Sequence, residues 1–388
     1  MAMKKWKELA GKPVIWLFAL FILGFTGWDL LTPDREMSEM ENRVLQQKPS
    51  LTLSTLFAKG DKAYSQRYEK YINDQFVLRD QWITLKSRAE SVLAKIENNG
   101  IAYGKDGYLF EKVVSVDEEN LADNIQYIRE FLEMYPQQSV TFSIVPNAYT
   151  VLTDKLPIGF EAITVDQRAR TAGIYSQLSG ENLHILDITD TLAAHSQEYI
   201  YYRTDHHWTT YGAYLAYCQY AESLGLTPVS QETLDTVKGG VVEGFYGTFD
   251  AKAKKADVQP DAITWYDIPC RVEINQEAVD SLHDLSKFEV RDKYAALMRG
   301  NNALTVLYSQ CNQDHQDGKT SRVLVVKDSY GNSMIPYLCY NFDEVYAVDL
   351  RYLGKMSVVL ADMEFDDLLI LYNFANFVDD TNIPKLRY

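Results

Sequence analysis

The stretch that decides the fold is VLVVKDSYGNS, residues 323–333. Four apolar residues end at Val326, and turn-forming residues surround Ser329. A short apolar run bounded by turn signals is typical of a strand buried in a sheet. A helix is predicted to follow at Ser333–Tyr340. In open α/β sheets, ligands bind outside the carboxyl ends of the strands, so Ser329 is predicted to lie where ligands bind.

Two interpretations of Ser329 follow from this position. A nucleophilic serine needs exposure and a base within hydrogen-bond reach, and backbone N–H groups at a helix start can stabilise an oxyanion. The other interpretation is structural, because Asp328 or Ser329 can simply cap the following helix. The turn by itself supports both equally.

Outward from this stretch, short apolar runs alternate with helical patterns, which predicts an α/β fold. This alternation of strands and helices is typical of a mostly parallel sheet covered by helices on both faces. The segment Val237–Ile274 is Gly-rich and irregular and is predicted to be an insertion of strands and loops. The predicted strands are Ser139–Val145, His184–Ile188, Leu304–Leu307, Val323–Val326, Glu344–Val348 and Leu368–Leu371, and the predicted helices are Glu118–Tyr135, Gln167–Leu178, Thr210–Leu224 and Lys355–Ala361.

A second chemical constellation is TDHHWT, residues 204–209, directly before a predicted helix. An imidazole acting as general base needs a carboxylate to hold its tautomer. In extended backbone, residues i and i+2 point the same way. Asp205 and His207 are therefore predicted to share a face, with His206 turned away, so His207 is favoured as the base.

Two alternatives for this box stay open. Asp205 or Thr209 can cap the following helix, which would make both histidines structural. Two histidines and a carboxylate are also good metal ligands. The other histidines have no ligand-like spacing, so no metal site is expected; they are His184, His195, His283 and His315.

Two weaker candidates follow other predicted strands. Asn373 ends the run LLILYN, where its amide can donate to an oxyanion or structure a loop. Arg351 follows a strand in VDLRYL and can meet an anionic or carbonyl group, or form an ordinary surface ion pair.

The N-terminal segment predicts attachment to a membrane. Residues 13–28, PVIWLFALFILGFTGW, carry no charge and follow four lysines within residues 1–12. We predict an anchor over 13–31, slightly short of the roughly 20 residues that span a bilayer. The basic flank should stay in the cytoplasm and the rest should face outward. A cleaved signal peptide is the alternative, although no small-x-small cleavage site follows Gly27.

Residues 32–100 are predicted to form a helical stalk that leads into a domain over residues 101–388. Apolar residues are spaced by three and four over Ser54–Phe76 and Arg79–Asn98, as in amphipathic helices. One stripe contains Phe57, Tyr64, Tyr68, Tyr71 and Ile72. We interpret it as the packing face of a stalk rather than as a binding surface.

Composition excludes several classes of protein. With 38 basic and 54 acidic residues the net charge is −16, which argues against nucleic acid as a partner. The four cysteines, Cys218, Cys270, Cys311 and Cys339, contain no CxxC pair, so a zinc knuckle or redox motif is not expected. A disulfide is possible outside the cell, but the sequence does not pair them.

Taken together, TDHHWT, the following YGAYLAY and VVKDSYGNS resemble the DHHW protein family. That family is related to the alginate-type O-acetyltransferases and more distantly to SGNH hydrolases. SEMENR at 38–43, NDQFVLRDQW at 73–82 and FYGTF at 245–249 fit the same pattern, so the resemblance covers nearly the whole ectodomain. It implies an SGNH-hydrolase-like fold and a triad of Asp205, His207 and Ser329. Asn373 falls near the position of the SGNH oxyanion asparagine by topology.

The resemblance also implies a function. Ser329 would attack an ester, and the acyl group would pass to water or to a hydroxyl of a cell-surface polysaccharide. A membrane-bound acyltransferase partner would supply the acyl group, and no cofactor is expected. One alternative is a non-catalytic envelope protein that keeps the fold for binding or scaffolding. Another is metal-dependent phosphoester hydrolysis at Asp205, His206 and His207.

Overall fold

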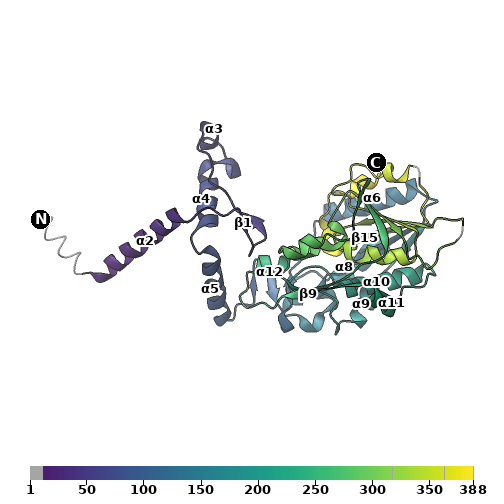
Figure 1. Cartoon of the computed structure of the whole chain (residues 1–388), viewed down its shortest axis with the longest axis horizontal. Helices are drawn as coiled ribbons and strands as arrows, with labels where there is room; N and C mark the ends of the chain where they lie inside the picture. The colour runs from purple at the N-terminus through teal and green to yellow at the C-terminus, as the bar shows by residue number, and fades with distance from the viewer. Residues whose placement is uncertain (1–11, 317, 362, 388) are drawn as a thin grey trace. The chain divides into compact units, whose positions relative to one another are not determined.

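The structure is a computed structural model that describes residues 12–316, 318–361 and 363–387 (Figure 1). The chain divides into two compact units. The first contains the chain up to Lys95 together with Lys254–Ala256, and the second contains Ile96–Ala253 and the chain from Asp257 onward. The predicted cytoplasmic segment 1–12 lies outside the described residues except for Lys12.

The first unit begins with helix α2, Pro13–Leu31. Proline suits the first turn of a helix, where its missing N–H has no intrahelical partner to lose. Among the described residues, α2 is the one helix long and apolar enough to cross a membrane, with a mean hydropathy of 2.0. A retained anchor and a signal sequence share this property, so the helix is compatible with both.

Three short helices and a helical turn follow α2 in the first unit. The predicted helix over Ser54–Phe76 is interrupted, because Gly60 adopts a positive φ of 60° that ends regular helix. The second predicted helix ends at Val92 rather than Asn98. The elements are α3 Leu53–Leu56, η1 Gly60–Lys62, α4 Tyr64–Gln75 and α5 Arg79–Val92, with a two-stranded sheet of β1 Met37–Ser38 and β2 Arg43–Val44.

Ion pairs join the SEMENR and NDQFVLRDQW stretches. Arg43 Nη2 lies 2.6 Å from Asp74 Oδ1, and Arg79 Nη2 lies 2.6 Å from Glu41 Oε2. Lys254 also pairs with Glu41. Asp74 and Glu41 are nearly inaccessible to solvent, so each needs a cationic partner. The two stretches are therefore complementary halves of one structural contact.

The second unit is built on an eight-stranded sheet with the order β11-β10-β12-β14-β13-β15-β6-β7. Strands β14, β13, β15, β6 and β7 run parallel, and β12, β10 and β11 extend one edge antiparallel. This confirms the predicted mostly parallel sheet. The strands are β6 Val140–Val145, β7 Leu183–Ile185, β10 Cys270–Ile274, β11 Glu277–Val279, β12 Leu304–Ser309, β13 Arg322–Lys327, β14 Glu344–Val348 and β15 Asp367–Asn373.

Helices cover both faces of this sheet. In β13, Val323 and Val325 join the core that contains α10, whereas Leu324 and Val326 join the core that contains α6. Successive strand residues point to opposite faces, so an uninterrupted apolar strand implies two covered faces. The helices are α6 Glu118–Met134, α7 Ala148–Val151, α8 Gln167–Gln177, α9 Thr189–Ala194, α10 Thr210–Ser223, α11 Gln231–Thr236, α13 Gly331–Met334, α14 Ser357–Leu360 and α15 Phe374–Asp379.

Smaller elements complete the second unit. β8 Lys238–Phe245 pairs with β9 Asp261–Tyr266 as a separate ribbon, with α12 Thr248–Ala253 between them. The predicted insertion 237–274 therefore stops short of β10, which pairs with β12 in the main sheet. All four cysteines carry free thiols. The remaining elements are strands β3 Glu97–Asn98, β4 Ile101–Tyr103 and β5 Leu109–Glu111, and 3-10 helices η2 Lys105–Gly107, η3 Thr153–Lys155, η4 Phe160–Ile163, η5 Leu285–Glu289, η6 Lys293–Arg299, η7 Ile335–Tyr340 and η8 Ile383–Arg387.

Candidate active site

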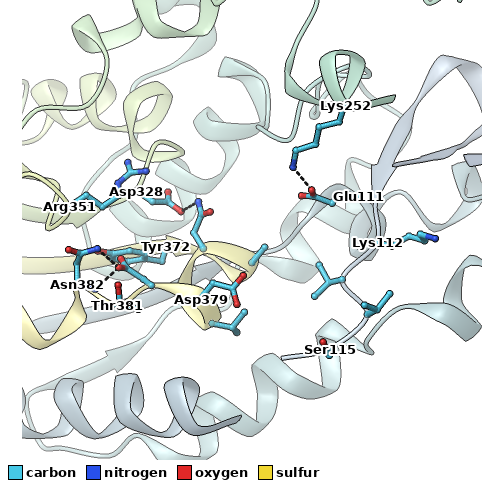
Figure 2. A pocket seen from close by; sticks show the side chains of 16 residues that line it. Glu111, Lys112, Ser115, Lys252, Asp328, Arg351, Tyr372, Asp379, Thr381 and Asn382 are labelled. Atoms are coloured by element: carbon cyan, nitrogen blue, oxygen red, sulfur yellow. Dashed lines mark hydrogen bonds and ion pairs between the residues drawn. The ribbon is translucent and has the colours of Figure 1, made fainter. Parts of the chain in front are cut away.

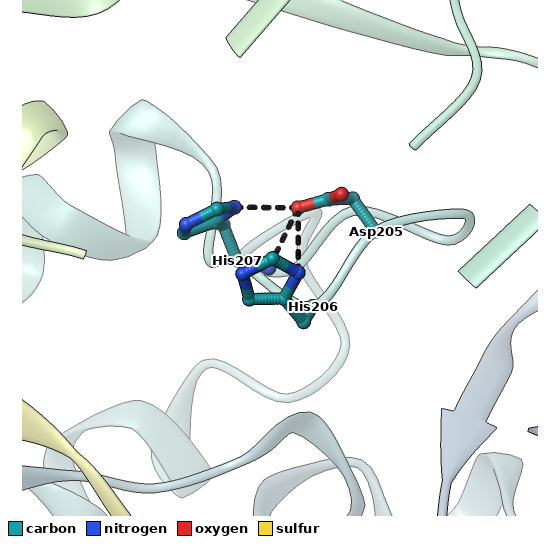
Figure 3. Close-up of side chains that lie close together, drawn as sticks. All are labelled: Asp205, His206 and His207. Carbon is teal, nitrogen blue, oxygen red and sulfur yellow. Dashed lines mark hydrogen bonds and ion pairs between the residues drawn. The ribbon is translucent and has the colours of Figure 1, made fainter. Parts of the chain in front are cut away.

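Ser329 lies between β13 and α13, at the carboxyl end of the sheet, and is partly exposed. Its Oγ lies 2.8 Å from Nε2 of His207. On the other side of the ring, Nδ1 of His207 lies 2.6 Å from Oδ1 of Asp205 (Figure 3). The structure therefore joins Ser329, His207 and Asp205 in one chain of hydrogen bonds.

The order of these hydrogen bonds fixes which ring nitrogen of His207 carries the proton. A carboxylate accepts hydrogen bonds, so Nδ1 of His207 donates its proton to Asp205. Nε2 then offers its lone pair to the Ser329 hydroxyl, which donates. A hydroxyl, an imidazole and a carboxylate in this arrangement can support general-base activation of the hydroxyl.

The loop at residues 203–209, here called the Asp-His loop, is fixed by its neighbours. An isolated bridge pairs Tyr201 with Trp208, and the buried Trp208 indole donates 2.8 Å to Ser333 Oγ. Thr209 Oγ1 accepts a 3.2 Å hydrogen bond from Gly212 N and caps α10. The capping alternative therefore applies to Thr209, which leaves Asp205 for His207.

Asp205 is held by the FYGTF run as well as by the histidines. Thr248 N donates to Asp205 Oδ2 at 2.7 Å, and a Cβ built on Gly247 would lie 2.3 Å from Asp205 Cβ. Burial opposes ionisation, but His206, His207 and these hydrogen bonds together hold the pKa of Asp205 well below its usual range. Asp205 is therefore a carboxylate at neutral pH.

His206 does not point away from Asp205, contrary to the predicted alternation. Its Nδ1 lies 3.6 Å from Asp205 Oδ1, and its ring centroid lies 3.8 Å from that of His207. The loop is a series of bends rather than extended backbone, so the two-residue period does not hold. Burial, followed by the neighbouring charge of His207, lowers the pKa of His206 to about 4. His206 is therefore neutral at pH 7.

The nucleophile turn, Lys327–Ser333, is anchored through Asp328. Its Oδ1 accepts from Tyr330 N at 2.9 Å, and its Oδ2 accepts from Asn373 N at 2.8 Å and Asn376 Nδ2 at 2.6 Å. Burial raises the pKa of Asp328. These contacts tie the turn to the end of β15, so Asp328 shapes the backbone that carries Ser329.

Asn373 and Arg351, the two weaker candidates, have structural partners. Asn373 Nδ2 donates to Val145 O at 3.0 Å, and its Oδ1 accepts from Ala375 N and caps α15. This geometry favours the loop-structuring interpretation of Asn373. Arg351 forms a fork with Asp349, with Nε at 2.9 Å and Nη2 at 2.5 Å from its two carboxylate oxygens.

A cavity of about 610 Å³ lies beside the nucleophile turn (Figure 2). Asp328, Arg351 and Asn376, which follow β13, β14 and β15, line one part of it. Glu111 and Lys252 line another part and form an ion pair. The cavity is polar and contains charges of both signs, so it suits a ligand with many hydrogen-bonding groups.

Tyr294 was missed by sequence analysis. Its ring stacks on that of His207 with a centroid separation of 3.7 Å and an angle of 10° between planes. Its hydroxyl donates to Ser329 O at 3.0 Å. Tyr294 therefore contacts both His207 and the backbone of Ser329. It lies in η6 with no motif around it, so no sequence signal marks it.

The Asp-His loop also contains the three residues of the alternative metal site. Ligand atoms of Asp205, His206 and His207 lie within 4.8 Å of one another, so the three could hold an ion. The 2.6 Å separation of His207 Nδ1 and Asp205 Oδ1 is a hydrogen-bond distance, which fits a shared proton better than two separate ligands of one ion. The geometry therefore favours the hydrogen-bonded chain.

Comparisons with solved structures agree with this fold. A DHHW family protein from Eubacterium siraeum DSM 15702 is 24% identical, with a TM-score of 0.61, and the match covers 75% of this chain and 96% of that one. Bacillus cereus PatB1 is 17% identical, with a TM-score of 0.56, and the match covers 72% and 97%. PatB1 with a sulfonyl adduct is 16% identical, also with a TM-score of 0.56, and the match covers 74% and 98%.

No curated protein matches the sequence. The family model described as DHHW protein matches residues 105–348, which contain the Asp-His loop and the nucleophile turn. That match spans more than half of the chain and confirms the resemblance stated from the motifs. The chain belongs to the DHHW protein family.

Proposed function

We propose that this protein is an extracytoplasmic serine acyl-transfer enzyme that acts on a cell-surface polysaccharide as an O-acyltransferase or an esterase. The observation that carries the proposal is the hydrogen-bonded chain from Ser329 through His207 to Asp205. Ser329 is partly exposed, and Asp328, which precedes it in the chain, lines a polar cavity. A serine with a base but no access would support a structural role instead.

In the first half of the reaction, Ser329 Oγ attacks the carbonyl carbon of an acyl donor. His207 Nε2 takes the hydroxyl proton, and Asp205 stabilises the imidazolium that forms. Collapse of the tetrahedral intermediate expels the donor's alcohol, which receives the proton from His207. Ser329 then carries the acyl group as an ester.

In the second half, an acceptor hydroxyl attacks the Ser329 ester while His207 takes its proton. The bond between the acyl carbon and Ser329 Oγ then breaks, and Ser329 recovers a proton from His207. Water as acceptor gives an esterase, and a sugar hydroxyl gives an O-acyltransferase. The same three residues serve both outcomes, so exclusion of water and binding of the acceptor decide between them.

The oxyanion of each tetrahedral intermediate needs donors. We assign this role to the backbone N–H of Ser329. One N–H of the Asn373 amide donates to Val145 O, so at most its second N–H is available to an oxyanion. Arg351 lines the cavity, so we assign it to contact with the acceptor rather than with the oxyanion. Its side chain is held in one orientation by Asp349, which suits recognition of a polar ligand.

A polysaccharide acceptor is what the resemblance to the DHHW protein family implies, and the chain belongs to that family. The cavity supports it through its size and polar lining. The acyl donor would come from a membrane-bound acyltransferase partner. A non-catalytic scaffold is the competing function, and it is favoured if the assembled side chains fail to turn over an ester.

The test uses the full chain in detergent with an aryl acetate as a simple acyl donor. We expect release of the aryl alcohol, and we expect Ser329→Ala and His207→Ala to abolish it. Ser176→Ala, an exposed serine on α8, is the matched control and should keep full activity. A folded wild type that releases no aryl alcohol, with or without an added glycan, would favour the scaffold function.

A further inference from the structure

The helices that follow α2 in the first unit lie across its C-terminal end rather than continuing its axis (Figure 1). Asp29 Oδ1, near the end of α2, accepts a 2.9 Å hydrogen bond from Val77 N, between α4 and α5. The ring centroid of Phe25 lies 5.9 Å from that of Trp82 on α5. Helices α4 and α5 therefore pack on the last turns of α2.

The length of α2 limits where these contacts can lie in a bilayer. Its 19 residues give a helix of about 28 Å, against a hydrocarbon core of about 30 Å. No turn of α2 is left over to stand outside the membrane. Phe25 lies six residues before Leu31, about 9 Å inside the end of the helix. If α2 crosses a bilayer, Trp82, which contacts Phe25, then lies within about 9 Å of the boundary between hydrocarbon and headgroups, on the acyl-chain side.

The surface of α4 that faces α2 is suited to that boundary. A cavity of about 590 Å³ lies between the two helices, lined on the α4 side by Tyr68, Ile72 and Phe76 and on the α2 side by Phe21 and Phe25. Its lining also includes the charged residues Asp29, Asp34 and Lys48. Tyrosine and tryptophan are enriched at membrane interfaces, where one end of the ring is apolar and the other is hydrated. A cavity with an apolar part and a charged part suits a lipid, whose acyl chain and headgroup differ in the same way.

Exposed apolar side chains also lie on the other helices of the stalk. On α3 and just after it, Leu53 and Phe57 are 77% and 78% exposed. On α5, Leu85 is 57% exposed. A run of large exposed apolar side chains is costly in water and marks a contact with protein or membrane. These side chains belong to the same compact unit as α2, which favours the membrane.

The helices of the stalk, over residues 53–92, carry a net charge opposite in sign to that of the whole chain. Over residues 53–92 there are seven Lys and Arg and five Asp and Glu, an excess of two positive charges in a chain of net charge −16. Basic residues near a bilayer are attracted to anionic lipid headgroups. The basic residues are Lys59, Lys62, Arg67, Lys70, Arg79, Lys86 and Arg88, and the acidic ones are Asp61, Glu69, Asp74, Asp80 and Glu90.

We infer that α2 is retained as a membrane anchor and that the apolar side of α3, α4 and α5 lies in the headgroup region of the same bilayer. Lipid acyl chains fill the cavity between α2 and α4. The stalk is then a collar on the membrane surface rather than a spacer that extends away from it. This inference concerns the first unit and is independent of the proposed acyl-transfer function.

The test places the full chain in nanodiscs that contain phosphatidylcholine brominated near the headgroup end of its acyl chains. Bromine quenches tryptophan fluorescence on contact. We compare the wild type with Trp82→Phe, which keeps an aromatic ring on α5, and with Trp265→Phe, a matched control on β9 in the second unit. If the collar lies in the headgroup region, bromine quenches Trp82 but not Trp265. The emission lost in Trp82→Phe should then be weaker in brominated than in ordinary nanodiscs, whereas the emission lost in Trp265→Phe should be the same in both.

Emission from Trp82 that is equal in brominated and ordinary nanodiscs would overturn the inference. So would an intact mass showing that the chain isolated from membranes begins after Leu31, because α2 would then have been removed as a signal sequence. Near-ultraviolet circular dichroism of both variants checks that the substitutions leave the fold unchanged.

Discussion

The Asp-His loop and the nucleophile turn each place a buried aspartate beside a chemically important side chain, and the pKa values of the two carboxyl groups shift in opposite directions. Asp205 is next to two histidines and accepts from Thr248 N, which holds its pKa low despite burial. Asp328 accepts from backbone N–H groups and Asn376, and burial raises its pKa. Equal burial therefore does not give equal pKa shifts, because the partners of each carboxyl group decide the direction of the shift.

The largest expected effect comes from replacing each carboxylate by its amide. Asp205→Asn can no longer fix the tautomer of His207, so kcat should fall by about 10³–10⁴-fold. Asp328→Asn presents an NH₂ group to the donors of Asn373 and Asn376. We expect it to lower the free energy of unfolding by about 1–3 kcal/mol, with kcat within about tenfold of wild type.

Aryl acetate turnover and urea unfolding of the two variants make this comparison directly. If Asp205→Asn kept wild-type kcat, the carboxylate would not act through His207. If Asp328→Asn lost as much activity as Asp205→Asn while staying folded, the division between a charged and a structural aspartate would be wrong.

A second prediction concerns the backbone that packs on Asp205. The Cβ of Gly247→Ala would clash with Asp205 Cβ and push the carboxylate from its place. We expect the substitution to cost about 1–3 kcal/mol of stability and to lower kcat by about 10–100-fold. Gly244→Ala is the control, because nothing lies within 4 Å of its Cβ, although its positive φ adds some strain. Equal effects of the two substitutions on kcat would contradict a specific role for Gly247.

A third prediction concerns the ring that stacks on His207. Tyr294→Leu removes the stack, and Tyr294→Phe keeps it while removing the hydrogen bond to Ser329 O. Aromatic pairs contribute about 0.5–1.5 kcal/mol, so we expect kcat to fall by about 2–12-fold in Tyr294→Leu, with KM nearly unchanged. Tyr294→Phe should lose less. A change confined to KM would show that Tyr294 contacts substrate instead of positioning His207.

The smallest expected effect concerns His206 and pH. Its folded pKa of about 4 lies below its ordinary value of 6.5, so the unfolded chain takes up the proton first as pH falls. The stability that comes from neutral His206 is present above pH 6.5 and is lost as pH falls toward 4. His206→Gln cannot titrate, so its urea unfolding should lose about 1 kcal/mol less than wild type between pH 7 and pH 5, after discounting for partial exposure. Identical pH dependence in both proteins would contradict the lowered pKa.

Sequence reasoning predicted the parts of this molecule that local patterns determine. β13 is an uninterrupted apolar run because both of its faces are buried, and the turn after it is marked by Ser329 and Gly331. The Asp-His loop was recognisable because its residue types and spacing carry the chemistry. The ion pairs between the SEMENR and NDQFVLRDQW stretches were not foreseen, but both stretches had been noted as motifs.

What the sequence could not predict depends on tertiary contacts. His206 turns toward Asp205 because the loop bends, and no local pattern distinguishes bends from extended backbone there. The partners of Asn373, Val145 and Ala375, are likewise set by the folded chain, and its role as an oxyanion donor stays a prediction. Tyr294 reaches His207 from η6, 87 positions away in the sequence, so its role exists only in the folded chain.

The proposed mechanism requires Ser329 to act as a nucleophile, and peptide mapping by mass spectrometry tests this most directly. The full chain is treated with a fluorophosphonate or a sulfonyl fluoride, digested, and the modified residue is identified. We predict a single adduct on Ser329 that is absent from Ser329→Ala and strongly reduced in His207→Ala. A folded wild type that carries no adduct on Ser329, or an adduct on another serine that persists in Ser329→Ala, would contradict the triad as the active site.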